Sequence, residues 1–224
     1  MHWQEQDTTI SHAAADLVTD LCFRIRCRRL PVDHAHTLST AVRQELPWIG
    51  QNKGVAIHTI HIAESGNGWL RPEQGASEVL LLSLRTRFIL RLPIAMVEKA
   101  KKLCGKTLDL PGFPIQVGNA GMRALVASTT LLARHVLVGE GENEDRFIQR
   151  ILSTLQSMQI VTPKILCGRS HTIQGRQKTY QTSSVLLGDL STTDSIRLQQ
   201  QGLGDHQLLG CGIFIPHKSI NAIH

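Results

Sequence analysis

Residues 21–30 read Leu-Cys-Phe-Arg-Ile-Arg-Cys-Arg-Arg-Leu, and Pro31 follows them directly. Apolar and basic side chains alternate along this run, and a period of two is typical of a strand that buries one face. Pro31 breaks the strand, and Asp33 stands where it can cap a helix. The apolar positions of that helix, up to Pro47, are Leu38, Ala41, Val42 and Leu46. The stretch therefore predicts a strand with a basic outer face, followed by a helix.

Further elements of the first half extend this strand–helix pair. We expect strands over 54–62, within 79–92 (most clearly 87–92) and over 122–128. A short basic helix is predicted over 94–103, and Ser65-Gly66-Asn67-Gly68 is predicted to form a loop. The order of elements in the first half is then βαββαβ.

The second half predicts the same order again. It contains a strand over 131–138, a helix over 144–158, a hairpin of 164–173 and 178–187 around Gly175, a helix over 191–201 capped by Ser191 or Thr192, and a strand over 213–215. The sequence therefore predicts an α+β fold of two tandem ferredoxin-like βαββαβ (RRM-like) domains, at 16–129 and 130–218.

The chain is basic, with 24 Lys and Arg against 18 Asp and Glu in 224 residues and a formal net charge of +6. No acidic residue lies between Asp145 and Asp189, so nothing in that stretch neutralises its cations. Such a balance favours a polyanionic partner, although a merely solvated basic surface is the simpler alternative. The candidate RNA-binding residues are Arg24, Arg26, Arg28, Lys164, Arg169, His171, Arg176 and Lys178. With 4% aromatic residues, backbone and stem contacts are favoured over base stacking.

The five cysteines form no Cys-x-x-Cys pair, and their number is odd. A disulfide framework or zinc site is therefore not expected, and neither is any other metal or cofactor. No apolar run approaches the roughly 20 residues of a membrane helix, and the N-terminus has no signal-peptide core. We expect no membrane association and a cytoplasmic location.

Four glycines, Gly202, Gly204, Gly210 and Gly212, surround a loop that leads directly into an apolar strand. Glycine reaches positive φ angles and lets another chain approach its backbone closely. The loop could present N–H groups to RNA phosphates or admit an RNA stem. The alternative is a tight helix-to-strand connection, and we expect a mixed role that includes packing against the first half.

Three motifs carry a resemblance to a known family. They are Leu30-Pro31-Val32-Asp33-His34, Glu64-Ser65-Gly66-Asn67-Gly68-Trp69, and the tail from Gly202 to Pro216, of the form G-L-G-x5-G-C-G-x-F-x-P. With the two predicted domains, they resemble the CRISPR-associated repeat-processing endoribonucleases of the RAMP superfamily, in its myxococcal-type branch. The resemblance spans about 16–216.

The resemblance implies an endoribonuclease that binds the stem-loop of CRISPR repeat RNA and cuts the precursor transcript within each repeat. The implied reaction needs no metal: the 2′-OH attacks the adjacent phosphate, leaving a 2′,3′-cyclic phosphate and a 5′-OH. The implied partners are the repeat RNA, the mature guide RNA and other CRISPR effector subunits.

The same resemblance places a catalytic histidine in the first helix, where this chain has His34 and His36. Histidine suits proton transfer because its ordinary pKa is about 6.5. His34 is the first candidate for the general base because it matches the family's Asp-His position. His36 is the second candidate, and a surface or capping role for both is the remaining alternative.

Two rival functions stay open at this stage. One is a non-cleaving RNA-binding subunit that holds the guide RNA in a CRISPR effector or guide-directed transposition complex. The other is a metal-binding or acylphosphatase-like fold that acts on small molecules. The lack of a P-loop, paired carboxylates or a metal-ligand cluster in the sequence disfavours the second.

Overall fold

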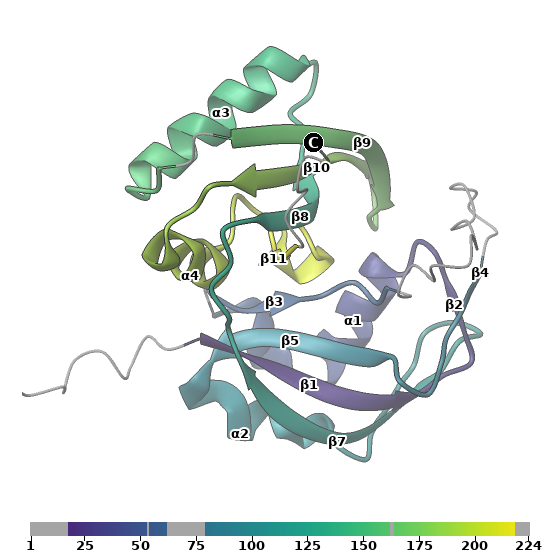
Figure 1. Ribbon diagram of the computed structural model, residues 1–224. Helices are drawn as coiled ribbons and strands as arrows, with labels where there is room; N and C mark the ends of the chain where they lie inside the picture. The colour runs from purple at the N-terminus through teal and green to yellow at the C-terminus, as the bar shows by residue number, and fades with distance from the viewer. Residues whose placement is uncertain (1–17, 53, 62–78, 162–163, 218–224) are drawn as a thin grey trace, which may run out of the picture.

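The computed structural model describes residues 18–52, 54–61, 79–161 and 164–217, which form two large antiparallel sheets, a separate two-stranded sheet and helices (Figure 1). The five-stranded sheet has the order β3-β5-β1-β7-β6. Its strands are β1 (Val18–Arg26), β3 (Ala56–Ile57), β5 (Arg87–Pro93), β6 (Thr107–Leu108) and β7 (Ile115–Ala124). The four-stranded sheet has the order β11-β8-β10-β9. Its strands are β8 (Leu131–Leu137), β9 (Lys164–Gln174), β10 (Thr179–Gly188) and β11 (Phe214–Pro216).

The core of the five-stranded sheet lies on the face that the alternation of residues 21–30 predicts to be buried. Leu21 and Phe23 pair with Leu90 and Phe88 across β1 and β5, and all four side chains are fully buried. Helices α1 (Ala35–Glu45) and α2 (Val97–Ala100) add their apolar residues to this core. The short 3-10 helices of this half are η1 (Pro47–Gly50), η2 (Ile94–Met96) and η3 (Lys101–Leu103).

Several predicted boundaries in this half are corrected. The strand predicted over 21–30 is split, because β2 (Arg29–Pro31) leaves the sheet and pairs with β4 (Val79–Leu81). The strand predicted within 79–92, most clearly over 87–92, is confirmed as β5, and residues 79–81 form the separate strand β4. The strand predicted over 54–62 keeps only Ala56–Ile57, and the helix predicted over 94–103 is the succession η2–α2–η3. The Ser65–Gly68 loop and the Glu64–Trp69 motif lie outside the described residues.

The fourth strand of this half begins earlier than its composition suggests. It was predicted over 122–128, whereas β7 runs from Ile115 to Ala124 and pairs with β1. The glycines of this stretch favour a loop in sequence terms, but Gly118 is needed in the strand. A Cβ there would lie 3.3 Å from the carbonyl oxygen of Arg24. Close approach of a neighbouring backbone is a common reason for glycine in a strand.

The second half confirms the predicted elements closely. Helix α3 (Glu144–Ser157) is capped by Asn143, whose side chain accepts a hydrogen bond from the Arg146 N–H. Helix α4 (Thr192–Gln201) is capped by Ser191, whose hydroxyl accepts from the Asp194 N–H. Strands β9 and β10 form the predicted hairpin. These helices and the sheet share a second apolar core, which includes Phe147, Leu187, Leu198 and Phe214.

The two sheets share one topology. When β6 is set aside, each has its four strands in the spatial order fourth, first, third, second, counted along its own half of the chain. The chain passes between the sheets once, in the segment that joins β7 to β8. Each half of the molecule is thus a mixed α and β unit of the same strand order.

Direct contacts hold the two sheets together. The Arg91 guanidinium, on β5, donates to the carbonyl oxygens of Gln199 (3.1 Å) and Phe214 (2.7 Å) in the second half. Gly210 packs on the backbone and side chain of Thr59, where an added Cβ would lie 2.6 Å from the Thr59 methyl carbon. Among the described residues, no helix has the length and apolar character needed to cross a membrane.

Candidate active site

A cleft of about 1160 Å³ opens where α1, the β9–β10 turn and the glycine loop meet. The polar side chains that line it include His36, Arg43, Arg176, Lys178, Tyr180 and His206. Because it is the candidate active site, we call this hollow the catalytic cleft. Three features that the sequence treats separately, the first helix, the basic hairpin and the glycine loop, therefore contribute to one site.

Helix α1 presents one polar face to the catalytic cleft. His36, Thr40 and Arg43 follow each other at helical spacing, and all three line the cleft. The start of the helix is tied to the hairpin, because the Asp33 carboxylate accepts a hydrogen bond of 2.9 Å from the Gln174 N–H. Burial raises the pKa of Asp33, and the Gln174 N–H and the nearby His36 oppose that rise. This hydrogen bond links the start of the helix to the hairpin.

His34 does not line the catalytic cleft. It is 2% exposed, and its Nδ1 lies 2.8 Å from the Pro31 carbonyl oxygen and 3.1 Å from that of Val32. Its Nε2 accepts a 2.8 Å hydrogen bond from the Ile60 N–H. An Nε2 that accepts leaves Nδ1 as the protonated nitrogen, so both ring nitrogens are engaged by the backbone. The ranking of His34 above His36 does not fit this burial, because the ring joins β2, α1 and the segment after β3.

The β9–β10 hairpin brings two of its predicted cations to the cleft. Arg176 and Lys178 line it, together with Tyr180. The Lys178 ammonium lies 4.9 Å from the centroid of the Tyr180 ring, within cation–π range. Tyr180 also contacts His206, with ring centroids 4.6 Å apart and planes inclined by 54°. Tyr180 thus connects the hairpin to the glycine loop.

The glycine loop is mainly a device for tight packing. Gly202, Gly210 and Gly212 all have positive φ, and an added Cβ would collide with Gln207, Thr59 and Leu203 respectively. Gly204 also has positive φ (73°), yet it is exposed, has open space around it and lines the cleft. The expected packing against the first half is confirmed at Gly210, and only Gly204 of these four glycines has room for a ligand.

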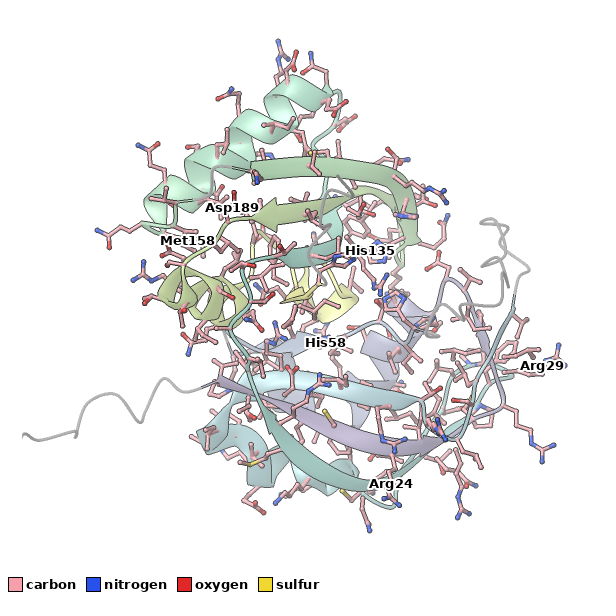
Figure 2. All side chains as sticks on the ribbon, in the orientation of Figure 1. Arg24, Arg29, His58, His135, Met158 and Asp189 are labelled. Atoms are coloured by element: carbon pink, nitrogen blue, oxygen red, sulfur yellow. The ribbon has the colours of Figure 1, made fainter. Side chains whose placement is uncertain are left out.

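The other predicted RNA-binding residues lie elsewhere. Arg24 and Arg26 are exposed on β1 and Arg28 just beyond it, and none of them lines the catalytic cleft (Figure 2 labels Arg24). Lys164 stands at the start of β9 and forms an ion pair of 2.9 Å with Asp189. Arg169 is exposed on β9, and the His171 ring lies against that of His135, with centroids 5.5 Å apart. Of the eight basic or imidazole side chains predicted to bind RNA, the structure therefore brings two, Arg176 and Lys178, to the cleft.

Sequence reasoning missed Arg43 as a site residue. It assigned no role to Tyr180, at the end of the predicted hairpin, and for His206 it indicated only a place near RNA through the glycine loop. Arg43 carried a usable signal, because it lies seven positions after His36 and so on the same helix face. Tyr180 is the only tyrosine of the chain and follows Lys178 by two positions, on the same side of the strand. His206 stands between the two glycine pairs, but its neighbour Tyr180 comes from another element and could not be inferred.

A separate group of charges surrounds the buried carboxylate of Asp20 between the sheets, and we call it the Asp20 network. Asp20 is 3% exposed and accepts from Arg91 Nε at 2.8 Å and from Arg123 at 3.0 Å. Burial alone raises the pKa of Asp20, but its interactions with His58 and with the Arg91 guanidinium hold that pKa far below its usual range.

His58 belongs to the same network and lies between the two sheets (Figure 2). Its Nε2 is 3.6 Å from the Asp20 carboxylate, too long for a hydrogen bond. Burial lowers the pKa of His58, against the opposing effect of Asp20. Arg91 and Arg123, which both donate to the Asp20 carboxylate, are the permanent cations that balance it.

The described residues contain no group of three or more His, Cys, Asp or Glu placed to hold a metal ion. All five cysteines lie among these residues without a disulfide, and burial raises the pKa of the Cys211 thiol to about 12. A thiol with such a pKa is a poor nucleophile, so Cys211 behaves as a packing residue.

Comparison with known proteins gives a consistent picture. A family model described as Cas6 Crispr matches residues 19–219. A curated relative, the CRISPR-associated endonuclease Cas6 of Myxococcus xanthus (strain DK1622), is 27% identical over 198 residues, which are 88% of this chain and 80% of the relative.

Solved structures share the fold at low sequence identity. A CRISPR associated protein Cas6 superimposes with a TM-score of 0.60 at 11% identity, covering 90% of this chain and all of the other. A RAMP protein described as binding different RNA substrates gives a TM-score of 0.59 at 13% identity, covering 89% of this chain and 100% of the other. A Cas6-related protein from Pyrococcus furiosus gives 0.57 at 11% identity, covering 88% and 97%.

Proposed function

The chain belongs to the Cas6 family of CRISPR proteins, and we propose that it is a metal-independent endoribonuclease that cuts CRISPR repeat RNA and releases guide RNAs. The family and the name of the Myxococcus relative support this activity. The observation that carries it is the catalytic cleft, where a helix-borne histidine faces a basic hairpin and the glycine loop. The shared strand order supports a description as two ferredoxin-like domains, with the predicted boundary between 129 and 130.

His36 is the proposed general base. It lines the cleft on the exposed side of α1, whereas His34 is enclosed by backbone groups. In the proposed reaction the imidazole of His36 takes the proton of the 2′-OH, and the 2′-oxygen attacks the adjacent phosphorus. The bond from phosphorus to the 5′-oxygen breaks, leaving a 2′,3′-cyclic phosphate and a 5′-OH. A positioned base of this kind contributes about 10²–10⁴-fold in rate.

Arg43 and Arg176 are the proposed stabilisers of the transition state. Both guanidinium groups line the cleft with His36, and the two residues also line its shallower extension beside Gln44 and Pro47. The pentacoordinate phosphorane carries more negative charge than the diester, and fixed cations aimed at that charge lower the barrier. Guanidinium is suited to this task because it offers paired N–H donors to phosphate oxygens.

The hairpin and the open part of the glycine loop are the proposed RNA-binding surface of the cleft. Arg176 and Lys178 would contact phosphates of the repeat stem, and the Gly204 backbone is free of neighbouring side chains on the Cβ side. Contacts of this type fix the position of an A-form stem without reading its sequence. Other effector subunits and a cytoplasmic location stay predictions from the resemblance.

One incubation tests the reaction itself. The purified protein is mixed with its cognate repeat RNA in excess EDTA, beside an RNA that carries one 2′-deoxy nucleotide just before the cut. We expect cleavage of the first RNA, survival of the second, and a product whose 3′ end is a cyclic phosphate.

The opposite results discriminate among the alternatives. Binding of both RNAs without cleavage of either would favour the non-cleaving subunit that only holds the guide RNA. Cleavage of the deoxy RNA would exclude attack by the 2′-oxygen, and activity lost in EDTA would exclude the metal-independent reaction. Absence of binding would remove the catalytic cleft as an RNA site.

A further inference from the structure

His206 lies at the rim of the catalytic cleft, contributed by the glycine loop rather than by α1. It is one of three non-glycine residues with positive φ among the described residues, with φ 62° and ψ 33°. Its carbonyl oxygen accepts from the N–H groups of Leu209 (2.8 Å) and Cys211 (3.3 Å). The backbone is therefore fixed in a left-handed conformation, which is uncommon for residues other than glycine.

The imidazole of His206 has a defined neighbour. It contacts the Tyr180 ring, at 4.6 Å between centroids, and Tyr180 in turn carries Lys178 at 4.9 Å. His206 is nevertheless exposed, so Tyr180 positions its ring without burying it. A ring held on one side and open on the other is suited to meet a ligand in the cleft.

The chemistry of the cleft leaves one proton unassigned. His36 accounts for the proton that leaves the 2′-OH, but the departing 5′-oxygen must gain one. Arginine does not release protons in proteins, and phenols and ammonium groups ordinarily have a pKa near about 10. A carboxylate, the group that Asp205 adds beside His206, only accepts hydrogen bonds. Imidazole is the side chain whose chemistry suits both taking and giving a proton, and His206 is the second imidazole that lines the cleft, besides His36.

We propose that His206 is a second catalytic residue, the general acid that protonates the leaving 5′-oxygen while His36 acts as the base. The inference rests on the proposed ribonuclease function. As the O2′–P bond forms and the P–O5′ bond breaks, one proton passes from the 2′-OH to His36 and another from the His206 imidazolium to the 5′-oxygen. Solvent then restores both rings to their starting states.

A substrate with a sulfur atom in place of the scissile 5′-oxygen tests this assignment. A thiolate leaves without protonation, so this RNA needs the base but not the acid. We expect His206→Asn to cut the ordinary RNA about 10²–10³-fold more slowly than the wild type but the sulfur RNA at nearly the wild-type rate. His36→Ala should be slow on both RNAs.

The variants are chosen to keep the fold. Asparagine tolerates the left-handed backbone and glycine adopts it freely, so His206→Gly is a second variant that removes the imidazole and keeps the backbone conformation. His217→Asn is the matched control, because His217 is an exposed histidine of the same tail that does not line the cleft. It should cut both RNAs at the wild-type rate, and all variants should bind the RNA as the wild type does.

The other possible results would overturn either the assignment of the general acid or the ribonuclease function on which it rests. Wild-type rates on ordinary RNA for both His206 variants would overturn the assignment of the acid. Equal slowing on both RNAs would also overturn it, because His206 would then act on binding or on loop structure. Failure of the wild type to cut either RNA would instead remove the proposed ribonuclease function.

Discussion

The catalytic cleft and the Asp20 network both lie where the two halves of the molecule meet, but their charges differ in burial and in pairing. In the network, Asp20 and Arg91 are each 3% exposed and lie 2.8 Å apart, and Arg123 completes the group. In the cleft, Arg43, Arg176 and Lys178 are exposed around a single carboxylate, that of Asp205. Buried charge is costly unless it is paired, whereas exposed charge can stay in excess to meet a ligand.

The contrast separates two functions of the contact between the sheets. The network fixes their relative position, because the Arg91 guanidinium also donates to backbone carbonyls of the second half. The cleft depends on that position, because its residues come from both halves. Substitutions in the network should therefore change the free energy of unfolding, and substitutions in the cleft should change RNA binding and cleavage.

The largest effect is expected from His34 and His36 at the start of α1, because the first is buried and the second lines the cleft. His36→Ala should slow RNA cleavage about 10²–10⁴-fold at unchanged stability, because it removes the proposed base, which is only partly buried and lines the cleft. His34→Ala should lower the free energy of unfolding by about 1–3 kcal/mol, because the Ile60 N–H and the Pro31 carbonyl lose their partner. Single-turnover cleavage and urea unfolding of both variants measure the two effects.

The reverse pattern would refute this division of roles. If His34→Ala lost activity while it kept full stability and binding, His34 would be the base, as its motif position suggests.

A second prediction concerns the Asp20 network. Asp20→Asn should lower the free energy of unfolding by about 3–5 kcal/mol, since Arg91 would stay buried without its counter-charge. Because the pKa of Asp20 is depressed in the folded protein, its contribution is present above the ordinary value of 3.8 and is lost as the pH falls below it. Unfolding measured from pH 7 to pH 2 should show this acid loss in the wild type and less of it in the variant.

The matched control is the exposed pair of Glu98 and Lys101, which are 2.7 Å apart. Glu98→Gln should change the unfolding free energy by less than about 1 kcal/mol. A similar loss in both variants would mean that the network is no stronger than a surface ion pair.

A third prediction compares two glycines of the same loop. Gly210→Ala should cost about 2–3 kcal/mol, because it combines a φ of 83° with a collision against Thr59. Gly204→Ala should cost only about 1 kcal/mol, because its φ of 73° is unfavourable for alanine but nothing lies in the way. Thermal unfolding compares the two, and equal losses would contradict the packing role of Gly210.

The smallest effect is expected from single cations of the hairpin. Arg176→Gln and Lys178→Gln should each weaken RNA binding severalfold and reduce the salt dependence of log Kd by about one charge. Arg24→Gln, at a cation outside the cleft, is the comparison. Binding titrations at several salt concentrations provide the slopes, and a larger effect at Arg24 would move the RNA to the outer face of β1.

The periodic parts of the chain could be predicted without a structure. Alternation at 21–26 and helical spacing in 144–157 specify which residues are buried, because each pattern reflects contacts with the element's own neighbours. Prediction was weaker at β3 and β7. The first is a two-residue edge strand, and the glycines of the second are explained only by the neighbouring backbone of β1.

The sequence by itself determined the order of the main elements, the basic hairpin, the glycines of the loop and the family resemblance. Only the tertiary structure decided that His36 faces the cleft while His34 is enclosed, and that Tyr180 meets His206. The physical reason is that local patterns report each residue's own backbone and its near neighbours. A site assembled from α1, the hairpin and the loop depends on contacts between separate elements, such as Asp33 with Gln174, 141 positions apart, and Tyr180 with His206.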